Sequence, residues 1–369
     1  MNQKPLARHS LGNIEALYLH DQNTGAVELQ IHPAGKSAHV PERRADHREN
    51  HWIARLPRRM ATRPSRKANS LVQFHRRGDT LNPNDPALSL MHSDSTNQLS
   101  YQNQETREEA GATFIRTHLH HPAGLSFTHN LKWQPGRPYV ECWVEVKNNG
   151  SEKQTLEFLT SFSLGGFSPF DRADSPDRLR LHRFRSFWSR EGRLVSSSPE
   201  EMNMAMPWIL ASFASERFGH VGSWPCHGWF PFLAIEDVED GVCWGAQLAL
   251  PGSWQMEVYR RDDCLDLSGG LADYNYGHWA KDLEPGQEFQ TPVACMSATS
   301  GGLEELCHQM QKWQEDRLTL SGEEKELPIQ ANDFCTHWGA TGHEPTLRML
   351  ERLKGSPVRY LVIDAGWYK

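Results

Sequence analysis

Apolar and polar residues alternate over short runs between about residue 10 and residue 300. Three of the clearest runs cover residues 26–31, 113–119 and 139–146. A period of two residues turns alternate side chains to opposite faces, which is typical of half-buried strands in antiparallel sheets. Because stretches with helical spacing are few, the pattern predicts a mainly β fold, with a large sandwich of two antiparallel sheets over residues 1–300.

The pattern becomes helical after Gly301. Apolar residues then recur every three or four positions as far as Arg317, namely Leu303, Leu306, Cys307, Met310 and Trp313. The charged run 321–326 that follows has the composition of a short linker. Residues 301–327 are therefore predicted to form an amphipathic helix that leaves the sandwich, and then a linker.

Residues 328–369 follow a third pattern. The runs 328–332 and 358–364 predict strands, and the leucines of 344–354 predict a helix that ends at Gly355. A strand, a helix and a strand in so short a segment form one βαβ unit with parallel strands. Two parallel strands cannot close a core alone, so this unit needs more chain or another body.

Polar and aromatic side chains follow both strands of this unit. Asn332-Asp333 end the first strand, Asp364 ends the second, and Trp338 and Trp367 lie just beyond. In β/α barrels, ligand-binding groups project from the carboxyl ends of the strands. A carboxylate can accept hydrogen bonds from vicinal hydroxyls, and an indole can stack on the apolar face of a sugar. The pattern suits a carbohydrate site, although helix capping or a salt bridge explains Asp364 equally well.

The overall charge limits the partners. The net charge is −7 and the isoelectric point is near 6.3, which argues against general binding to nucleic acid or to anionic membranes. The basic stretch 43–67 departs from this average, but acidic residues and prolines interrupt it, so solvated loops explain it better than a phosphate or RNA contact. No apolar run of 18 residues and no apolar N-terminal segment occurs.

The cysteines and histidines predict no metal and no cofactor. Seven cysteines are spread singly, and an odd number without paired spacing fits a reducing cytoplasm better than a disulfide framework. No C-x-x-C occurs, so a structural zinc site is not expected. His118 and His120 share one face of a predicted strand, which can suit a metal, but without a carboxylate or cysteine partner exposed strand histidines are favoured.

A family resemblance is carried by residues 179–186, 251–259, 277–279 and 328–369. These stretches resemble glycoside hydrolase family 36, the α-galactosidases of the melibiase type. The resemblance covers nearly the whole chain and concerns the N-terminal part of such enzymes only. It implies a β-supersandwich domain over residues 1–300, followed by the first βαβ unit of a truncated (β/α)8 barrel over residues 328–369.

The resemblance also implies a retaining hydrolase that acts on terminal α-linked galactose in oligosaccharides. Two carboxylates about 5–5.5 Å apart would act as nucleophile and as acid and base. In the family they come from barrel strands four and six, beyond residue 369, so no residue here is assigned a catalytic role and this chain alone is expected to be inactive.

The resemblance assigns substrate-binding roles to Asp364, Trp338 and Trp367. Asp364 would bind hydroxyls of the terminal sugar, and Trp338 and Trp367 would line its pocket. Family enzymes commonly have two consecutive aspartates at this strand end, where this chain has Asp364-Ala365. The missing second carboxylate leaves a modified or different α-linked hexose open.

Two other functions remain open. A large sandwich with exposed tryptophans could be a non-catalytic carbohydrate-binding or oligomer-assembly module. An enzyme that uses the histidines of 118–121 with a metal is much less favoured.

Family enzymes are often homo-oligomers in which the sandwich helps to shape a neighbouring active site, so a homo-oligomer is one expectation.

Overall fold

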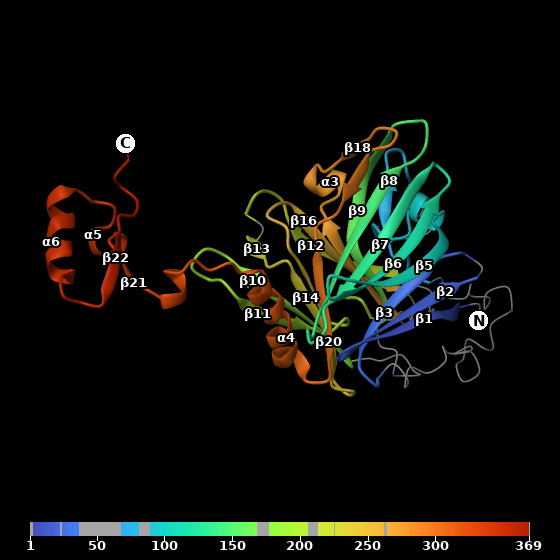
Figure 1. Cartoon of the computed structure of the whole chain (residues 1–369), viewed down its shortest axis with the longest axis horizontal. Coiled ribbons are helices and arrows are strands. Elements are labelled where there is room, and N and C mark those ends of the chain that lie inside the picture. Colours follow the sequence, from blue (N-terminus) through green and yellow to red (C-terminus); the bar gives the residue numbers. More distant parts are fainter. Residues whose placement is uncertain are drawn as a thin grey trace. The chain divides into compact units, whose positions relative to one another are not determined.

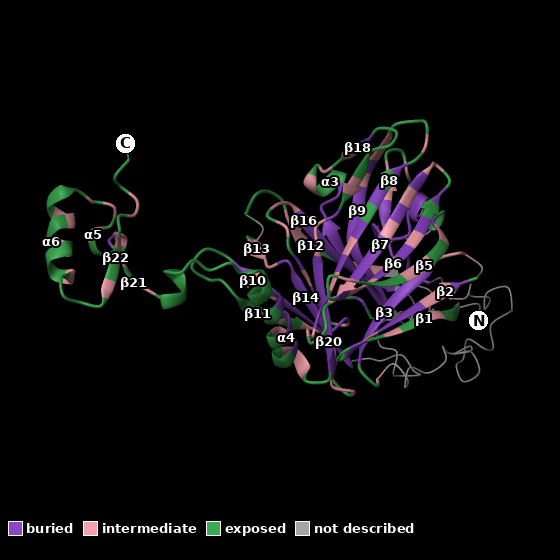
Figure 2. Ribbon diagram, viewed as in Figure 1, coloured by how far each residue is buried: buried purple, intermediate pink, exposed green. Residues whose placement is uncertain are grey.

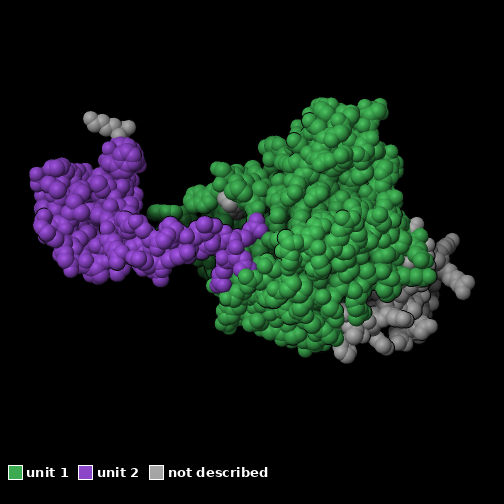
Figure 3. Space-filling view, in the orientation of Figure 1, with its two compact units in different colours: residues 1–313 green, residues 314–369 purple. Residues whose placement is uncertain are grey.

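The computed structural model describes residues 3–22, 24–36, 68–80, 89–167, 177–205, 213–224, 226–261 and 264–368. The basic stretch 43–67 lies outside the described residues. The chain divides into two compact units, residues 1–313 and residues 314–369 (Figure 3). The division falls inside the segment 301–327 that was predicted to link two domains. None of the helices described is long and apolar enough to span a membrane.

Three antiparallel sheets build unit 1 among the described residues (Figure 1). The first has the order β1-β2-β3, with β1 Gln3–Leu11, β2 Ile14–Asp21 and β3 Val27–Pro33. The largest has the order β11-β10-β14-β15-β20-β8-β7-β6-β5. Its strands are β5 Ser100–Glu109, β6 Ala112–His121, β7 Leu125–Trp133, β8 Val140–Asn148, β10 Leu179–Ser186, β11 Arg193–Ser197, β14 Phe232–Asp237, β15 Val242–Leu248 and β20 Ala294–Thr299. Two short strands join it, β13 Gly228–Trp229 beside β10 and β19 Glu288–Gln290 beside β8.

The third sheet has the order β12-β16-β17-β9-β18, with β4 paired to β9. Its strands are β4 Phe74–Arg76, β9 Gln154–Phe167, β12 Phe213–His220, β16 Trp254–Arg261, β17 Cys264–Leu271 and β18 Lys281–Leu283. Two one-turn helices, α2 Asp94–Asn97 and α3 Tyr274–Gly277, lie in the connections. Every strand pairing described in unit 1 is antiparallel, so the prediction of a mainly β, antiparallel fold is confirmed.

One apolar core lies between the sheets of unit 1. It takes alternate residues from both larger sheets, for example Val140 and Val144 of β8 and Phe162 and Leu164 of β9. Aromatic rings cross between the layers, and the ring centroids of Phe74 and Phe127 are 4.6 Å apart. Figure 2 shows this buried interior running along most strands of the unit. The period of two residues in the sequence therefore corresponds to one face of each strand that packs in the core and one face that points away from it.

Strand β3 departs from the half-buried pattern, because all of its residues are buried. Val27, Leu29 and Ile31 face the core. The alternate face is polar and equally buried, and there the Gln30 side chain donates to Glu28 Oε1 over 2.7 Å. These polar groups fit beneath β9 because Gly165 and Gly166 have no side chain, where a Cβ would overlap Glu28 and Gln30. Alternation predicted this strand correctly but not the burial of its polar face.

Helix α4, Gly302–Arg317, covers the other face of the largest sheet. Its buried Leu306, Met310 and Trp313 form a second apolar cluster with residues of β14, β15 and β20. The Trp313 indole also donates to Glu141 Oε1 over 2.8 Å. The helix comes close at Gly245 of β15, where a Cβ would lie 2.7 Å from Leu306. The amphipathic helix predicted at 301–317 is present, and its first three turns pack on the sheet.

Unit 2 contains one parallel strand pair and few buried groups. After the 3-10 turn Glu324–Glu326, strand β21, Ile329–Asn332, pairs in parallel with β22, Val358–Val362. The short helix α5, Phe334–His337, and helix α6, His343–Leu353, connect them. The predicted βαβ unit is therefore present.

The apolar faces of unit 2 are not covered by other described residues of the same unit. Helix α6 buries no side chain, and Leu347 and Leu350 are 44% and 45% exposed. On and just after β22, Tyr360 and Ile363 are 40% and 46% exposed (Figure 2). Strands of a parallel sheet are normally buried on both faces. Unit 2 therefore exposes apolar side chains that a parallel sheet and its helices normally bury, and its assignment to a barrel stays a prediction.

Replacing Leu306 by alanine tests the packing of α4. The side chain is fully buried, so we expect Leu306→Ala to lower the free energy of unfolding by about 3 kcal/mol, from lost burial and a residual cavity. Urea denaturation followed by tryptophan fluorescence measures this change. The exposed Glu304→Ala on the same helix is the control and should stay within about 0.5 kcal/mol of the parent. Equal stability of all three proteins would mean that α4 does not pack as described.

Removal of residues 328–369 tests the independence of unit 1. Both apolar clusters of the sandwich lie within residues 1–313. We expect the shortened chain to keep its cooperative thermal transition and to be more soluble, because the uncovered strand pair is an aggregation hazard. Calorimetry and the soluble yield give the result. Loss of the cooperative transition would contradict the division into two units.

Candidate functional site

The carboxyl ends of β21 and β22 meet, because the two strands run in parallel and Asn332 lies opposite Val362. The backbone N–H of Asp364 donates to Asp333 Oδ1 over 2.9 Å. The Asn332 side chain donates to Asp364 Oδ2 over 2.6 Å. Two polar residues that end the first strand thus hold the carboxylate that ends the second.

Asp364 has capacity left for a ligand. Its Oδ1 accepts from the backbone N–H of Ala365 over 2.7 Å, and its Oδ2 accepts from Asn332. An ionised carboxylate has about four lone-pair sites, so roughly one remains on each oxygen. The residue is only partly buried. Two adjacent sugar hydroxyls could therefore donate to a carboxylate whose orientation Asn332 fixes.

Asp333 has a different position and a different role. Its side chain is 1% exposed. Besides the Asp364 N–H, it accepts from the Thr341 hydroxyl over 2.9 Å. The hydrogen bond from the Asp364 backbone holds the pKa of the Asp333 carboxyl below its usual range, and Thr341 and His337 act in the same direction. Asp333 is thus a buried anion that joins the two strand ends and does not face a ligand.

Trp338 and Trp367 are 77% and 68% exposed. Gly339 follows Trp338, and Gly366 precedes Trp367. The two glycines lie so close that a Cβ on Gly366 would overlap the backbone of Gly339. Gly366 has a φ of +105°, which favours glycine. The loops after β21 and β22 are therefore in contact, and each presents one indole to solvent. Asn332 and Asp333 were expected at a strand end that suits a carbohydrate site, but binding roles were predicted only for Asp364, Trp338 and Trp367.

The histidines of β6 have polar neighbours from the adjacent strands. His118 Nδ1 lies 3.1 Å from the Thr128 hydroxyl, and its Nε2 lies 3.8 Å from Glu105 Oε1. This carboxylate lies on the adjacent strand β5, so no pattern within β6 indicated it. His120 is exposed. Across the described part of the chain, no three histidine, cysteine or acidic side chains gather into a group that could hold a metal ion.

A buried thiol and imidazole also lie in contact. Cys142 Sγ is 3.2 Å from His129 Nε2, and both residues are fully buried. Burial raises the pKa of the Cys142 thiol well above its usual range and lowers the pKa of His129 to about 4. Both groups are therefore neutral near pH 7. Because a nucleophilic cysteine must form a thiolate, this pair belongs to the core and not to an active site.

Comparison with known proteins gives a consistent picture. No protein-family model matches the chain. The α-galactosidase Mel36A of Lactobacillus acidophilus is 25% identical over 148 residues, which are 38% of this chain and 20% of that protein. The family 36 α-galactosidase AgaA of Geobacillus stearothermophilus superposes with a TM-score of 0.69 at 14% identity over 98% of this chain. The α-galactosidase of Lactobacillus brevis gives 0.67 at 15% identity over the whole chain.

The chain resembles the family 36 α-galactosidases. It spans about half the length of the two solved relatives, since it covers 50% of each. This share is consistent with the N-terminal part of those enzymes. Variants of the AgaA enzyme have been solved with raffinose and with stachyose, which are galactoside oligosaccharides. At this level of identity the likeness establishes the fold, and the roles of Asp364, Trp338 and Trp367 stay predictions.

The hydrogen bond between the Asp364 N–H and Asp333 can be tested by titration. An ionised acceptor shifts the amide proton downfield, so the Asp364 amide signal should titrate with Asp333. Because the folded pKa of Asp333 is lowered, its stabilising contact is complete above the ordinary aspartate pKa and is lost as the pH falls through the folded value. NMR spectra between neutral and strongly acidic pH measure this. Asp333→Asn should abolish the titration and the control Asp364→Asn should keep it, whereas persistence in Asp333→Asn would contradict the contact.

Proposed function

We propose that this chain forms part of an α-galactosidase-like retaining glycoside hydrolase that acts on terminal α-linked galactose in oligosaccharides. The observation that carries the proposal is the pair of joined strand ends, where Asn332 holds the carboxylate of Asp364 beside two exposed indoles. The likeness of the whole chain to half of such enzymes supports it.

In this proposal, residues 1–300 are the β-supersandwich, 301–327 the linking segment and 328–369 the start of the (β/α)8 barrel. The uncovered faces of α6 and β22 support the last assignment, because further βα units would bury them. The six cysteines with described side chains are free, which supports a reducing, cytoplasmic location. A homo-oligomer remains an expectation from the family.

The chain's own residues would bind and orient the terminal sugar. Asp364 would accept hydrogen bonds from two vicinal hydroxyls, Asn332 would keep its carboxylate in place, and Trp338 with Trp367 would contact the apolar face of the ring. Binding of this kind lowers the barrier by holding the anomeric carbon in line with the reacting groups. The nucleophile and the acid are assigned to no residue of this chain.

Hydrolysis by the enzyme that contains this chain tests the proposal. We expect raffinose and an aryl α-galactoside to be cleaved, with α-galactose as the first product in proton NMR spectra, since a retaining mechanism preserves the anomer. Asp364→Asn should lower kcat/KM by about 10- to 100-fold, because hydrogen bonds to a charged acceptor are lost. Glu344→Gln, at an exposed carboxylate of the same unit, is the matched control and should change nothing.

Three outcomes would contradict the proposal in different ways. Release of β-galactose first would exclude the retaining mechanism. Equal activity of the Asp364→Asn and Glu344→Gln variants would exclude the strand-end site. Saturable binding of raffinose without any hydrolysis would favour the alternative function, a non-catalytic carbohydrate-binding module.

A further inference from the structure

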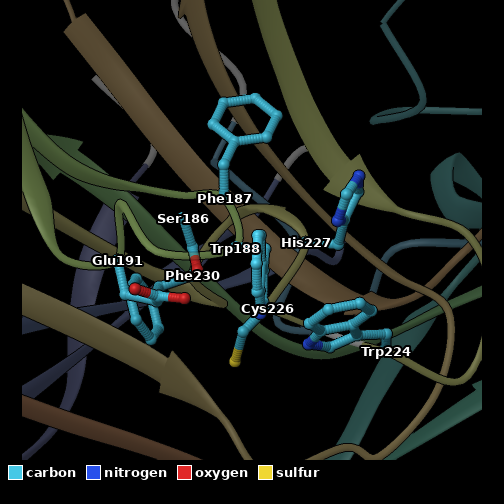
Figure 4. Close-up of a pocket in the computed structure, with 8 residues that line it drawn as sticks. All are labelled: Ser186, Phe187, Trp188, Glu191, Trp224, Cys226, His227 and Phe230. Carbon is cyan, nitrogen blue, oxygen red and sulfur yellow. The ribbon is translucent and has the colours of Figure 1, made fainter. Parts of the chain in front are cut away.

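A second aromatic site lies in unit 1 and uses none of the strand-end residues of unit 2. A cavity of about 140 Å³ opens between the loop that joins β10 to β11 and the side chains of Trp224, Cys226 and His227, which come before β13 (Figure 4). The side chains that matter for its chemistry are Phe187, Trp188, Glu191, Trp224, His227 and Phe230. None of them was singled out by the sequence patterns, and the proposed hydrolase does not use them.

The strand pairing beneath the cavity holds its two walls together. Ser186 at the end of β10 pairs with Gly228 of β13, and Arg185 pairs with Trp229. The pairing continues where the Phe230 N–H donates to the Phe184 carbonyl over 2.9 Å. Ser186 ends β10 where Gly228 begins β13, so the residues on both sides of the cavity come from the same end of this strand pair. The strand pairing thus brings the two walls of the cavity together.

Ring contacts fix the His227 side of the cavity. The His227 ring lies 5.7 Å from Phe187, 5.5 Å from Trp224 and 5.4 Å from His220, measured between centroids. In the view of Figure 4, Trp188 stands between Glu191 and Trp224. One wall thus carries a packed aromatic group, and a carboxylate lies at the other side.

The exposure of these indoles sets them apart from the others in unit 1. Trp188 and Trp224 are 77% and 57% exposed, whereas the other described tryptophans of this unit are buried or half-buried. Exposed apolar surface that gathers at one place marks a binding site more often than scattered exposure does. Both indoles line the same cavity, which is the arrangement expected if they receive a common ligand.

Their polar atoms are also available. The N–H groups of Trp133, Trp143, Trp244 and Trp313 donate to protein oxygens. Those of Trp188 and Trp224 make no hydrogen bond to any residue that the structure describes. Glu191 Oε1 accepts a hydrogen bond from the Ser189 N–H over 2.8 Å. Its Oε2 accepts no hydrogen bond from the residues that the structure describes. The cavity therefore combines apolar faces with free donors and a free acceptor.

We propose that this cavity is a sugar-binding site that receives one pyranose ring and is built from residues of unit 1 alone. A cavity near 150 Å³ accommodates a single six-membered ring, whereas sites for larger ligands exceed 300 Å³. A pyranose has an apolar face for an indole, and its rim of hydroxyls can donate to Glu191 and accept from the indole N–H groups. The pyranose site is argued from unit 1 alone, and it rests on the proposed hydrolase function only for the choice of galactosides as test ligands.

The free polar atoms favour a sugar over a protein partner as the occupant. Exposed tryptophans can also be anchors of protein interfaces. An apolar anchor from a partner would leave the Glu191 carboxylate and the two indole donors buried without partners, which is unfavourable. A polyol satisfies all three. Assembly through this surface is therefore an alternative outcome of the test.

Fluorine NMR of the full chain labelled with 5-fluorotryptophan tests the proposal directly. The signals of Trp188, Trp224, Trp338 and Trp367 are assigned from single Trp→Phe variants and followed during titration with raffinose, galactose and glucose. We expect the Trp188 and Trp224 signals to shift saturably with at least one of these sugars. Glu191→Gln should weaken this binding about tenfold, whereas Asp364→Asn, at the other site, should leave it unchanged.

Each other outcome overturns the proposal. Shifts confined to Trp338 and Trp367 would restrict sugar binding to the strand-end site and leave the proposed hydrolase intact. No shift of the Trp188 and Trp224 signals at any soluble sugar concentration would exclude a sugar in this cavity. If sedimentation instead finds an oligomer that Trp188→Ala converts to monomer, without any sugar-dependent shift, the cavity is a protein contact.

Discussion

Burial of apolar side chains between the two larger sheets is the constraint on which unit 1 depends. The rings of Phe167 on β9 and Trp244 on β15 meet edge to face, with centroids 5.4 Å apart. Contacts of this kind decide which face of each strand turns inward, since a shift of one residue would exchange the two faces. Leu179 and Leu181 of β10 belong to the same core, so its packing also positions the strand that leads into the loop with Trp188.

Close packing of the layers requires glycine at particular points. Gly165 and Gly166 allow the buried polar face of β3 to lie against β9, and Gly245 allows α4 to lie against β15. In each case the partner is distant in sequence. The buried carboxylate of Glu28 is tolerable there because it accepts hydrogen bonds from Gln30 and from the Asn69 backbone. The sandwich thus contains a polar layer that contributes specificity of packing as well as an apolar core.

The two candidate sites arise from different physical circumstances. At the strand ends of unit 2, a parallel pair brings Asn332, Asp333 and Asp364 together, and one buried carboxylate orients the loop that bears the other. In unit 1, antiparallel register places two loops beside one another and leaves a ring-sized cavity between their aromatic side chains. Both sites combine exposed indoles with a carboxylate. This combination suits carbohydrate and links the two proposals through one kind of ligand chemistry.

The sequence by itself determined the local structure and the kind of chemistry. A period of two residues identified strands such as β6 and β8, helical spacing identified α4, and the resemblance to family 36 drew attention to Asp364. These properties follow from neighbours along the chain. The tertiary structure alone decided that the polar face of β3 is buried, that Asp333 supports Asp364, and that Trp188 and Trp224 share one cavity. Each of these depends on contacts between segments far apart in sequence, which a local pattern of apolar and polar residues cannot specify.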